Sequence, residues 1–111
     1  MTSTAKSLVR AKYAEATQTT QYTAVNCKTV IDKFTVSNGT GGNVTISINF
    51  VPPAGTVGAG NLIISNKSIA PGQCYTCPEL VGKLIESTGF ISTIAGAATS
   101  LVIEVNGHEI T

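Results

Sequence analysis

Two cysteines, Cys74 and Cys77, stand in C-x-x-C spacing within the stretch QCYTCPE. This spacing occurs in zinc sites and in thiol oxidoreductases. In a thiol oxidoreductase the motif begins a helix whose N-terminus stabilises the thiolate, whereas Pro78 follows the second cysteine here and favours an extended backbone at Cys77. Residues three apart in a strand point to opposite faces of the sheet. We therefore expect the two thiols to diverge, and we interpret both as small apolar residues.

A zinc site would require the three cysteines and the one histidine of the chain to meet in the fold; they are Cys27, Cys74, Cys77 and His108. Four such ligands suit a structural zinc ion. Structural zinc sites usually hold their ligands in two close pairs, however, and this chain offers at most one. We expect no metal and no cofactor, and metal analysis of protein prepared without chelator tests that expectation.

His108 is also the only histidine that could serve as a general base for a nucleophile. We interpret it as an exposed side chain on a terminal strand, and a small hydrolase built around it is the alternative. The carboxylates of the strand-like region are dispersed, so no pair for glycoside cleavage is indicated; they are Asp32, Glu79, Glu86, Glu104 and Glu109. The sequence predicts no catalytic residue and no enzyme.

The elements that must position these side chains are strands, as the composition of this single domain indicates. Hydrophobic residues make up 42% of the 111 residues and charged residues only 12%, with 11 glycines. Polarity supplied by Thr, Ser and Asn is typical of an all-β protein. The net charge of +1 implies neither nucleic acid nor an acidic membrane as a partner. No stretch approaches the roughly 20 apolar residues of a membrane span.

The clearest strand is NVTISINFV, in which Val44, Ile46, Ile48 and Phe50 alternate with polar residues. This period of two predicts a half-buried strand.

The preceding run, TVIDKFTVSN, places Val30, Phe34 and Val36 on one face, with Asp32 out of phase. A β-bulge near Asp32 would turn Ile31 inward and Asp32 outward. The glycine-rich NGTGGN between the two runs predicts that they form a hairpin.

Later segments complete a set of about eight short strands. The loop VPPAGTVGAGN is followed by LIIS, KSIA, a turn at Pro71-Gly72 and a strand from Cys74 to Cys77. ELVGKLIES is a strand or one helical turn, and FISTIAG, TSLVIEV and HEIT are strands, the last after a turn at Asn106-Gly107. This pattern predicts an antiparallel β-sandwich of jelly-roll type.

Residues 1–21 differ from the body at 22–111 because they are basic and sparsely apolar. We interpret them as an N-terminal arm or a short helix, and favour the arm because so few apolar side chains hold the segment to the body. A disordered leader is the alternative. We expect the body to stay folded, and to bind its partner poorly, when residues 1–20 are deleted.

A docking arm would bury its apolar side chains on another protein while its cations pair with acidic groups there. The candidate partner-binding residues are Lys6, Leu8, Val9, Arg10, Lys12, Tyr13 and Tyr22.

Three stretches of the body resemble small β-sandwich virion proteins of tailed bacteriophages. They are YTAVNCKTVIDKFTVSNGTGGNVTISINFVPPAGT, NKSIAPGQCYTCPELVGKLIES and SLVIEVNGHEIT. Together with the length, they are most similar to the capsid decoration proteins, also called staple or cement proteins, of short-tailed double-stranded DNA bacteriophages of the epsilon-15 type. The resemblance covers residues 22–111, consists of turn and strand patterns, and does not include the C-x-x-C spacing.

The resemblance implies a non-enzymatic structural protein of the virion, made in the cytoplasm of the bacterial host. Such a protein binds the outer capsid surface, staples neighbouring subunits of the major capsid protein and stabilises the shell. On a local two-fold axis of the capsid we expect it to be a homodimer, and we expect no nucleic acid and no membrane as partners. The alternative is a carbohydrate-binding, or fibre- or tail-associated, virion module for host attachment, since jelly rolls often bind sugars. The chain has no Trp and few other aromatic residues for a sugar platform.

Overall fold

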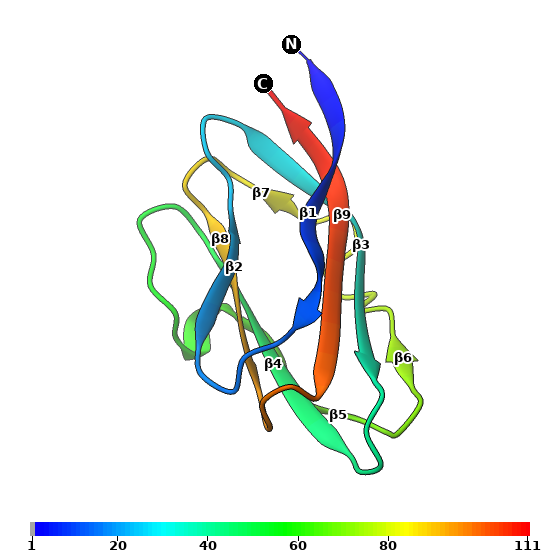
Figure 1. Ribbon diagram of the computed structural model, residues 1–111. Coiled ribbons are helices and arrows are strands. Elements are labelled where there is room, and N and C mark those ends of the chain that lie inside the picture. Colours follow the sequence, from blue (N-terminus) through cyan, green and yellow to red (C-terminus); the bar gives the residue numbers. More distant parts are fainter. Residues whose placement is uncertain (1) are drawn as a thin grey trace.

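Nearly every element of the protein is a strand, and the strands form two antiparallel sheets that face each other (Figure 1). The computed structural model describes residues 2–111. Within them the one helical element is a single 3-10 turn, η1 (Ala59–Asn61), and no helix has the length and apolar character needed to cross a bilayer. The predicted all-β sandwich is therefore confirmed.

Sheet 1 contains the first and the last strand of the protein. Its order is β1-β9-β3-β6, and the short β7 also pairs with β3. The strands are β1 (Ser3–Tyr13), β9 (Leu101–Ile110), β3 (Lys28–Asn38), β6 (Cys74–Tyr75) and β7 (Leu84–Ile85). The two termini lie side by side at one end of this sheet (Figure 1).

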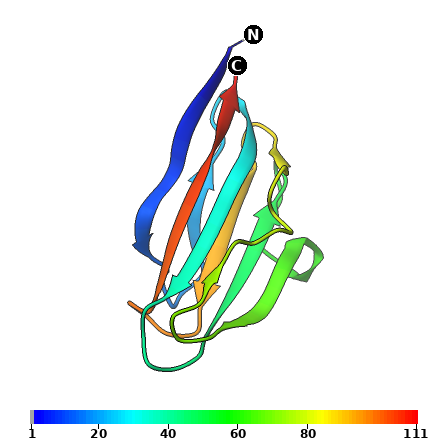
Figure 2. The same cartoon turned by 90° about the vertical axis from the view of Figure 1, so that its right-hand side faces the viewer.

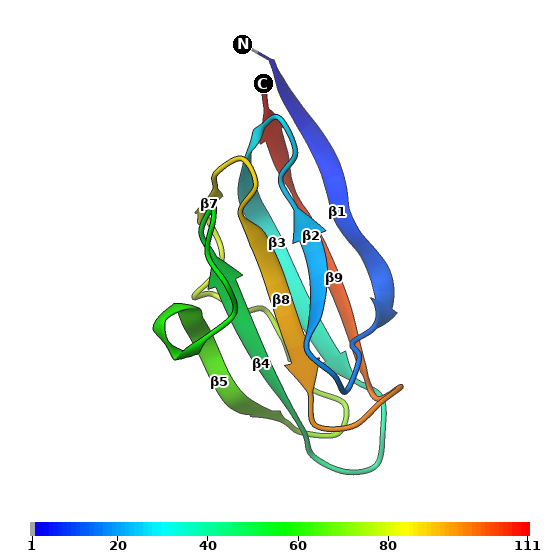
Figure 3. The ribbon, with the colours of Figure 1, turned by 90° about the vertical axis from the view of Figure 1, so that its left-hand side faces the viewer.

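Sheet 2 covers the inner face of sheet 1 and has the order β2-β8-β4-β5 (Figure 3). Its strands are β2 (Thr19–Thr23), β8 (Phe90–Ala95), β4 (Val44–Val51) and β5 (Leu62–Ile69). The segments LIIS and KSIA, predicted as two strands, lie in the single strand β5, except for Ala70, which follows it.

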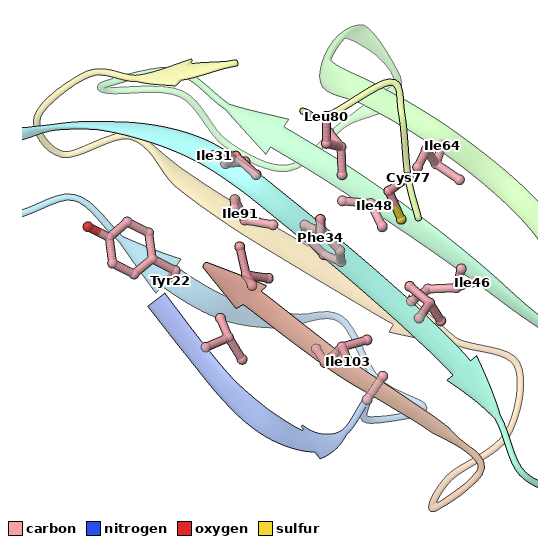
Figure 4. Packing of buried hydrophobic residues seen from close by; sticks show 14 of the residues in the cluster. Tyr22, Ile31, Phe34, Ile46, Ile48, Ile64, Cys77, Leu80, Ile91 and Ile103 are labelled. Atoms are coloured by element: carbon pink, nitrogen blue, oxygen red, sulfur yellow. The ribbon is translucent and has the colours of Figure 1, made fainter. Parts of the chain in front are cut away.

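The core fills the space between the sheets (Figure 4). Phe34 on β3 is fully buried and lies among isoleucines from both sheets. The largest fully buried side chains are Phe34, Ile31, Ile46, Ile48, Ile69, Leu80, Ile85, Ile91, Leu101, Ile103, Val36 and Val51. Burial of such side chains is the main favourable term in folding.

The predicted bulge in β3 is present. The pairing register between β3 and β9 shifts between Ile31 and Lys33. Ile31 is fully buried and Asp32 is exposed, because the extra residue restores the inward phase of the apolar side chains.

Strand β4 has the predicted alternation, but its polar face is covered as well. Asn49 is buried, and its Nδ2 donates to the carbonyl of Gly58 at 3.0 Å and to Asn61 Oδ1 at 2.8 Å. Ser47 is buried beside β5, where its Oγ accepts the backbone N–H of Asn66 at 2.8 Å. The loop after β4 thus hydrogen-bonds to Asn49, and the neighbouring strand β5 to Ser47, although the alternation predicts that both side chains face solvent.

The predicted hairpin between β3 and β4 is wrong, because these strands belong to different sheets. The NGTGGN segment forms a corner that carries the chain from sheet 1 to sheet 2. The buried Asn38 holds this corner: its Nδ2 donates to the carbonyls of Gly42 at 2.8 Å and Ile69 at 2.7 Å, and its Oδ1 accepts the N–H of Thr40 at 2.9 Å.

The predicted turn at Asn106-Gly107 is also wrong, since β9 runs through both residues. Gly107 is required by close packing and not by a turn. A Cβ at this position would lie 2.2 Å from the carbonyl oxygen of Val30 and 2.9 Å from Leu8 Cδ1.

The N-terminal segment is neither a helix nor an arm over most of its length. Ser3–Tyr13 is strand β1 and pairs antiparallel with β9. Main-chain hydrogen bonds hold it, which a count of apolar side chains does not reveal. A register shift between Ser7 and Val9 breaks the alternation and allows the successive residues Leu8 and Val9 both to be buried.

The segment between β5 and β8 is mostly turns. The Pro71-Gly72 turn is confirmed by a 3.0 Å hydrogen bond from the N–H of Gln73 to the carbonyl of Ala70, with Gly72 at φ 75°. ELVGKLIES contains consecutive turns that end in the two-residue strand β7. Only Cys74 and Tyr75 of the predicted 74–77 strand are extended in the sheet.

Candidate functional site

Strand β1 presents the longest open edge of the sandwich (Figure 2). Nine of its 11 residues are exposed. It pairs with β9 on one side, and no strand of residues 2–111 pairs with the other side. It carries three cations and no acidic residue. We call this surface the β1 edge.

Two of the three cations on the β1 edge have carboxylate partners within the chain. Lys6 Nζ lies 3.3 Å from both carboxylate oxygens of Glu109, and Lys12 Nζ lies 3.0 Å from Glu15 Oε2. Within residues 2–111 Arg10 forms no ion pair, and it is exposed. A guanidinium binds a carboxylate through two parallel hydrogen bonds, so Arg10 is the cation best placed to bind an acidic group of another molecule.

Tyr13 is the exposed aromatic residue of β1, with 53% of its surface accessible. It lies opposite Val102 of β9, near the end of the strand. A tyrosine in such a position offers apolar area and one hydroxyl group to a partner.

Leu8 and Val9 are not available for the partner contact that the sequence predicts. Only 9% and 5% of their surfaces are exposed, because both side chains belong to the chain's own core. Of the predicted contact residues on β1, the surface retains Lys6, Arg10, Lys12 and Tyr13.

Tyr22 is likewise an interior residue. Its ring lies at the margin of the apolar cluster, with the hydroxyl pointing away from the cluster (Figure 4). The hydroxyl donates to Glu109 Oε2 at 2.5 Å and lies 2.8 Å from Thr29 Oγ1. The one hydroxyl proton of Tyr22 goes to the carboxylate, so Tyr22 accepts the hydrogen bond that Thr29 donates. The proton of Thr29 is then used, and Thr29 Oγ1 accepts a hydrogen bond from Cys27 Sγ at 3.6 Å.

This chain of hydrogen bonds joins both sheets, and it explains two pKa shifts. Burial, followed by the bond to Glu109, raises the pKa of the Tyr22 hydroxyl. The hydrogen bond from Tyr22, assisted by Lys6, lowers the pKa of Glu109. The sequence does not indicate this cluster, because Tyr22 and Glu109 are 87 positions apart.

The two cysteines of the C-x-x-C motif diverge as predicted, although the backbone differs. Cys74 is exposed on β6, while Cys77 is fully buried with φ 45°, a left-handed and not an extended conformation. Burial raises the pKa of the Cys77 thiol to about 12. A thiol that stays protonated is a poor nucleophile and a poor metal ligand.

Metal-ligating side chains are not gathered anywhere in residues 2–111: no three His, Cys, Asp or Glu side chains lie close enough to hold one ion. All three cysteines are free, with Cys27 and Cys77 buried.

His108 has a partner that its sequence position does not reveal. Its Nδ1 lies 2.5 Å from Asp32 Oδ2, and both side chains are nearly half exposed. The bulge in β3 turns Asp32 outward beside β9 and so brings the two groups together. Within the part of the chain that the structure describes, the contact of the imidazole is with this carboxylate.

Tyr75 contacts two charged side chains, Glu79 and Lys67. Its hydroxyl donates to the Glu79 carboxylate at 2.5 and 2.6 Å, and Lys67 Nζ lies 4.9 Å from the ring centroid. Burial, followed by this hydrogen bond, raises the pKa of Tyr75 to about 12, and the same bond lowers the pKa of Glu79.

A shallow hollow lies where β4 and β7 end, with a cavity volume of about 170 Å³. Its walls are mostly apolar, and Lys83 Nζ lies 6.0 Å from the centroid of the Phe50 ring. The lining residues are Phe50, Val51, Pro52, Pro53, Leu84, Ile85 and Glu86. Pockets that enclose a small-molecule ligand are usually about 300–1,000 Å³, so this hollow suits a single side chain better than a whole ligand.

Comparisons of the chain with protein-family models, with curated proteins and with solved structures found no match.

Proposed function

We propose that this chain is a structural protein of a bacteriophage virion, without enzymatic activity, that binds the outer capsid surface and staples neighbouring subunits of the major capsid protein. The observation that carries the proposal is the β1 edge, a long, exposed strand with an exposed tyrosine and with Arg10, which forms no ion pair within residues 2–111. The resemblance of residues 22–111 to decoration proteins of the epsilon-15 type supports the choice of partner.

We further propose that the sandwich is a jelly roll. In a jelly roll, eight successive strands fold back as one long hairpin, so that the first pairs with the eighth, the second with the seventh, and so on inward. When β6 and β7, which both pair with β3, are taken as one interrupted strand, these hairpin pairs are present as β1·β9, β2·β8, β3·β6/β7 and β4·β5. The additional pairs β3·β9 and β4·β8 join them into the two sheets. The strand order supports this topology.

The proposed mechanism of stapling is thermodynamic linkage. A protein that binds the assembled lattice and not the separated subunits stabilises the lattice. A copy that bridges two subunits buries on the order of 1,000 Å² or more, and many copies act together, so modest affinity per contact suffices. A copy on a two-fold axis of the shell would be a homodimer with one patch facing itself.

The direct test uses particles of the phage that encodes the chain, prepared with and without its gene. We expect the protein on purified particles, and we expect particles without it to release DNA at a lower temperature. Adding the purified protein back should restore the release temperature. Purified particles that contain none of the protein would contradict the proposal.

The competing function is carbohydrate recognition by a fibre- or tail-associated module. The hollow beside Phe50 and Glu86 is the surface at which we test it, because a protruding group of a sugar could enter there. A glycan array with the purified protein discriminates: specific binding that a Phe50→Ala variant loses would favour attachment over stapling.

A further inference from the structure

In the first half of β1, the main-chain N–H and C=O groups of successive residues point alternately toward β9 and toward the open side of the strand. Thr2 and Thr111 exchange two hydrogen bonds, from Thr2 N–H to Thr111 O at 3.0 Å and from Thr111 N–H to Thr2 O at 2.9 Å. In an antiparallel ladder such pairs recur at every second residue. Since the register is unbroken from Ser3 to Ser7, Thr4 and Lys6 direct their main-chain groups to β9.

The intervening residues Ser3, Ala5 and Ser7 therefore direct their N–H and C=O groups outward. All three are exposed and have small side chains, so another strand can approach closely. Two views of the molecule show no ribbon on the outer side of β1 along this stretch (Figures 2 and 3).

The other sheet edges are less suited to pairing. Strands β6 and β7 have two residues each and β2 has five. Strand β5 is longer, but Asn66 in its middle adopts φ 47° and breaks the extended backbone. Natural proteins blunt sheet edges by such short or interrupted strands. Residues 3–7 are the regular open stretch.

We propose that Ser3–Ser7 accepts an extended, acidic segment of a capsid subunit as an added strand of sheet 1. This inference rests on the proposed function and specifies how the partner is held. Strand addition supplies affinity through main-chain hydrogen bonds, while side chains at alternate positions select the sequence.

Charge determines the choice of an acidic segment over a second copy of this chain. The strand carries Lys6, Arg10 and Lys12 with no acidic residue. Two β1 edges paired with each other would bring cations together, which is unfavourable across strands. An acidic strand would instead place a carboxylate near Arg10, which forms no ion pair within residues 2–111.

The test is Ala5→Pro, with Ala5→Val as the matched control. Proline removes the outward N–H of residue 5 and is tolerated on an edge strand whose N–H faces solvent, whereas valine keeps that donor and favours a strand. Binding is measured to capsids of the encoding phage that were assembled without this protein. We expect Ala5→Pro to bind at least tenfold more weakly than the wild type and Ala5→Val to bind within threefold of it. Unfolding midpoints in urea verify that both variants are folded.

A second pair of variants keeps the test valid if proline perturbs the strand. Arg10→Glu should weaken binding to the same capsids at least tenfold. Lys33→Glu makes the same charge change at an exposed lysine on β3 and should leave binding within threefold of the wild type. Hydrogen exchange of a peptide covering residues 2–8 should slow on the particle in the wild type.

Each contrary outcome has a distinct meaning. Equal binding by the wild type and a folded Ala5→Pro variant, without slowed exchange, overturns strand addition and leaves the stapling proposal standing. Equal effects of Arg10→Glu and Lys33→Glu overturn the acidic character of the partner. A wild-type dimer that Ala5→Pro converts to a monomer shows that a second copy occupies the edge, against the proposal. Failure of the wild type to bind the capsids overturns the proposed function itself, and the capsid partner with it.

Discussion

Tyr22 on β2 donates a 2.5 Å hydrogen bond to Glu109 on β9, and this contact joins sheet 2 to sheet 1 near the chain termini. Lys6 of β1 binds the same carboxylate, so Glu109 connects three strands. The arrangement anchors the half of β1 on which the proposed strand addition depends.

We expect Tyr22→Phe to lower the free energy of unfolding by about 1–3 kcal/mol, because it removes a hydrogen bond to a charged group and leaves Thr29 without its acceptor. Urea unfolding measures the change. Tyr75→Phe is the matched control: it removes the same kind of hydrogen bond, to Glu79, at an exposed site, and should cost less than about 1 kcal/mol. Equal losses of unfolding free energy in the two variants would show that the Tyr22–Glu109 hydrogen bond stabilises the protein no more than the exposed Tyr75–Glu79 bond.

The lowered pKa of Glu109 predicts how stability depends on pH. Its folded pKa lies below the ordinary value of 4.5, so its contribution is present above pH 4.5 and is lost as the pH falls through the folded pKa. We expect the acid-induced loss of unfolding free energy to be smaller in Glu109→Gln than in the wild type, as measured by urea titrations between pH 2 and pH 7. Glu79, whose pKa is also lowered but at the exposed Tyr75, provides the control as Glu79→Gln. An unchanged acid slope in Glu109→Gln would contradict the prediction.

Gly107→Ala should destabilise the protein by about 1–3 kcal/mol or more, since the new methyl group would lie 2.2 Å from the carbonyl oxygen of Val30. The backbone of Val30 can move away from the new methyl group only if β3 and β9 separate. Gly41→Ala is the control because a Cβ there meets nothing within 4 Å. Thermal unfolding measures both, and similar midpoints for the two variants would rule out tight packing at Gly107.

Leu8→Ala should lower the free energy of unfolding by about 2–5 kcal/mol, as expected for truncation of a buried leucine. Tyr13→Ala, on the same strand but exposed, should change it by less than about 0.5 kcal/mol and weaken capsid binding instead. Chemical unfolding and particle binding, measured on both variants, separate the two roles. A stable Leu8→Ala variant that fails to bind capsids would contradict this prediction and show that Leu8 contacts the partner.

Thiol labelling of the native protein should modify one cysteine. Cys74 is exposed, whereas Cys27 and Cys77 are buried, and burial raises the pKa of Cys77 to about 12. Mass spectrometry after brief treatment with a maleimide should therefore show one adduct, on Cys74, and three adducts after denaturation. Rapid labelling of Cys77 in the native state would show that its segment opens.

Local patterns in the sequence predict the features that depend on neighbouring residues. The alternation of β4, the bulge at Asp32 and the Pro71-Gly72 turn are all of this kind. Each follows from the period of two or from the conformational preference of one residue.

Features that depend on contacts between distant segments cannot be predicted from neighbouring residues alone. Asn106-Gly107 has the composition of a turn but is extended, because β1 and β3 approach it from both sides. The Tyr22–Glu109 and Asp32–His108 pairs can be predicted only when the strand order is known, because each pair joins two different strands.

The same limit applies to the N-terminal segment. The sequence predicts that the body stays folded without residues 1–20, yet Leu8 and Val9 lie in the core and β1 covers one edge of β9. Deletion would expose that edge and open a cavity, so we now expect the truncated chain to be destabilised.

Thr2 and Thr111 are hydrogen-bonded neighbours, so the two ends of the described part of the chain, residues 2–111, lie at one spot. A tag or cargo domain fused to either terminus would leave the molecule from the same point. A short linker joining the two would give a cyclic chain, and reopening that ring at the glycine-rich corner after Asn38 would yield a circular permutant with the same sheets. In such a permutant β1 would no longer be terminal in sequence, while its outer edge would still be free.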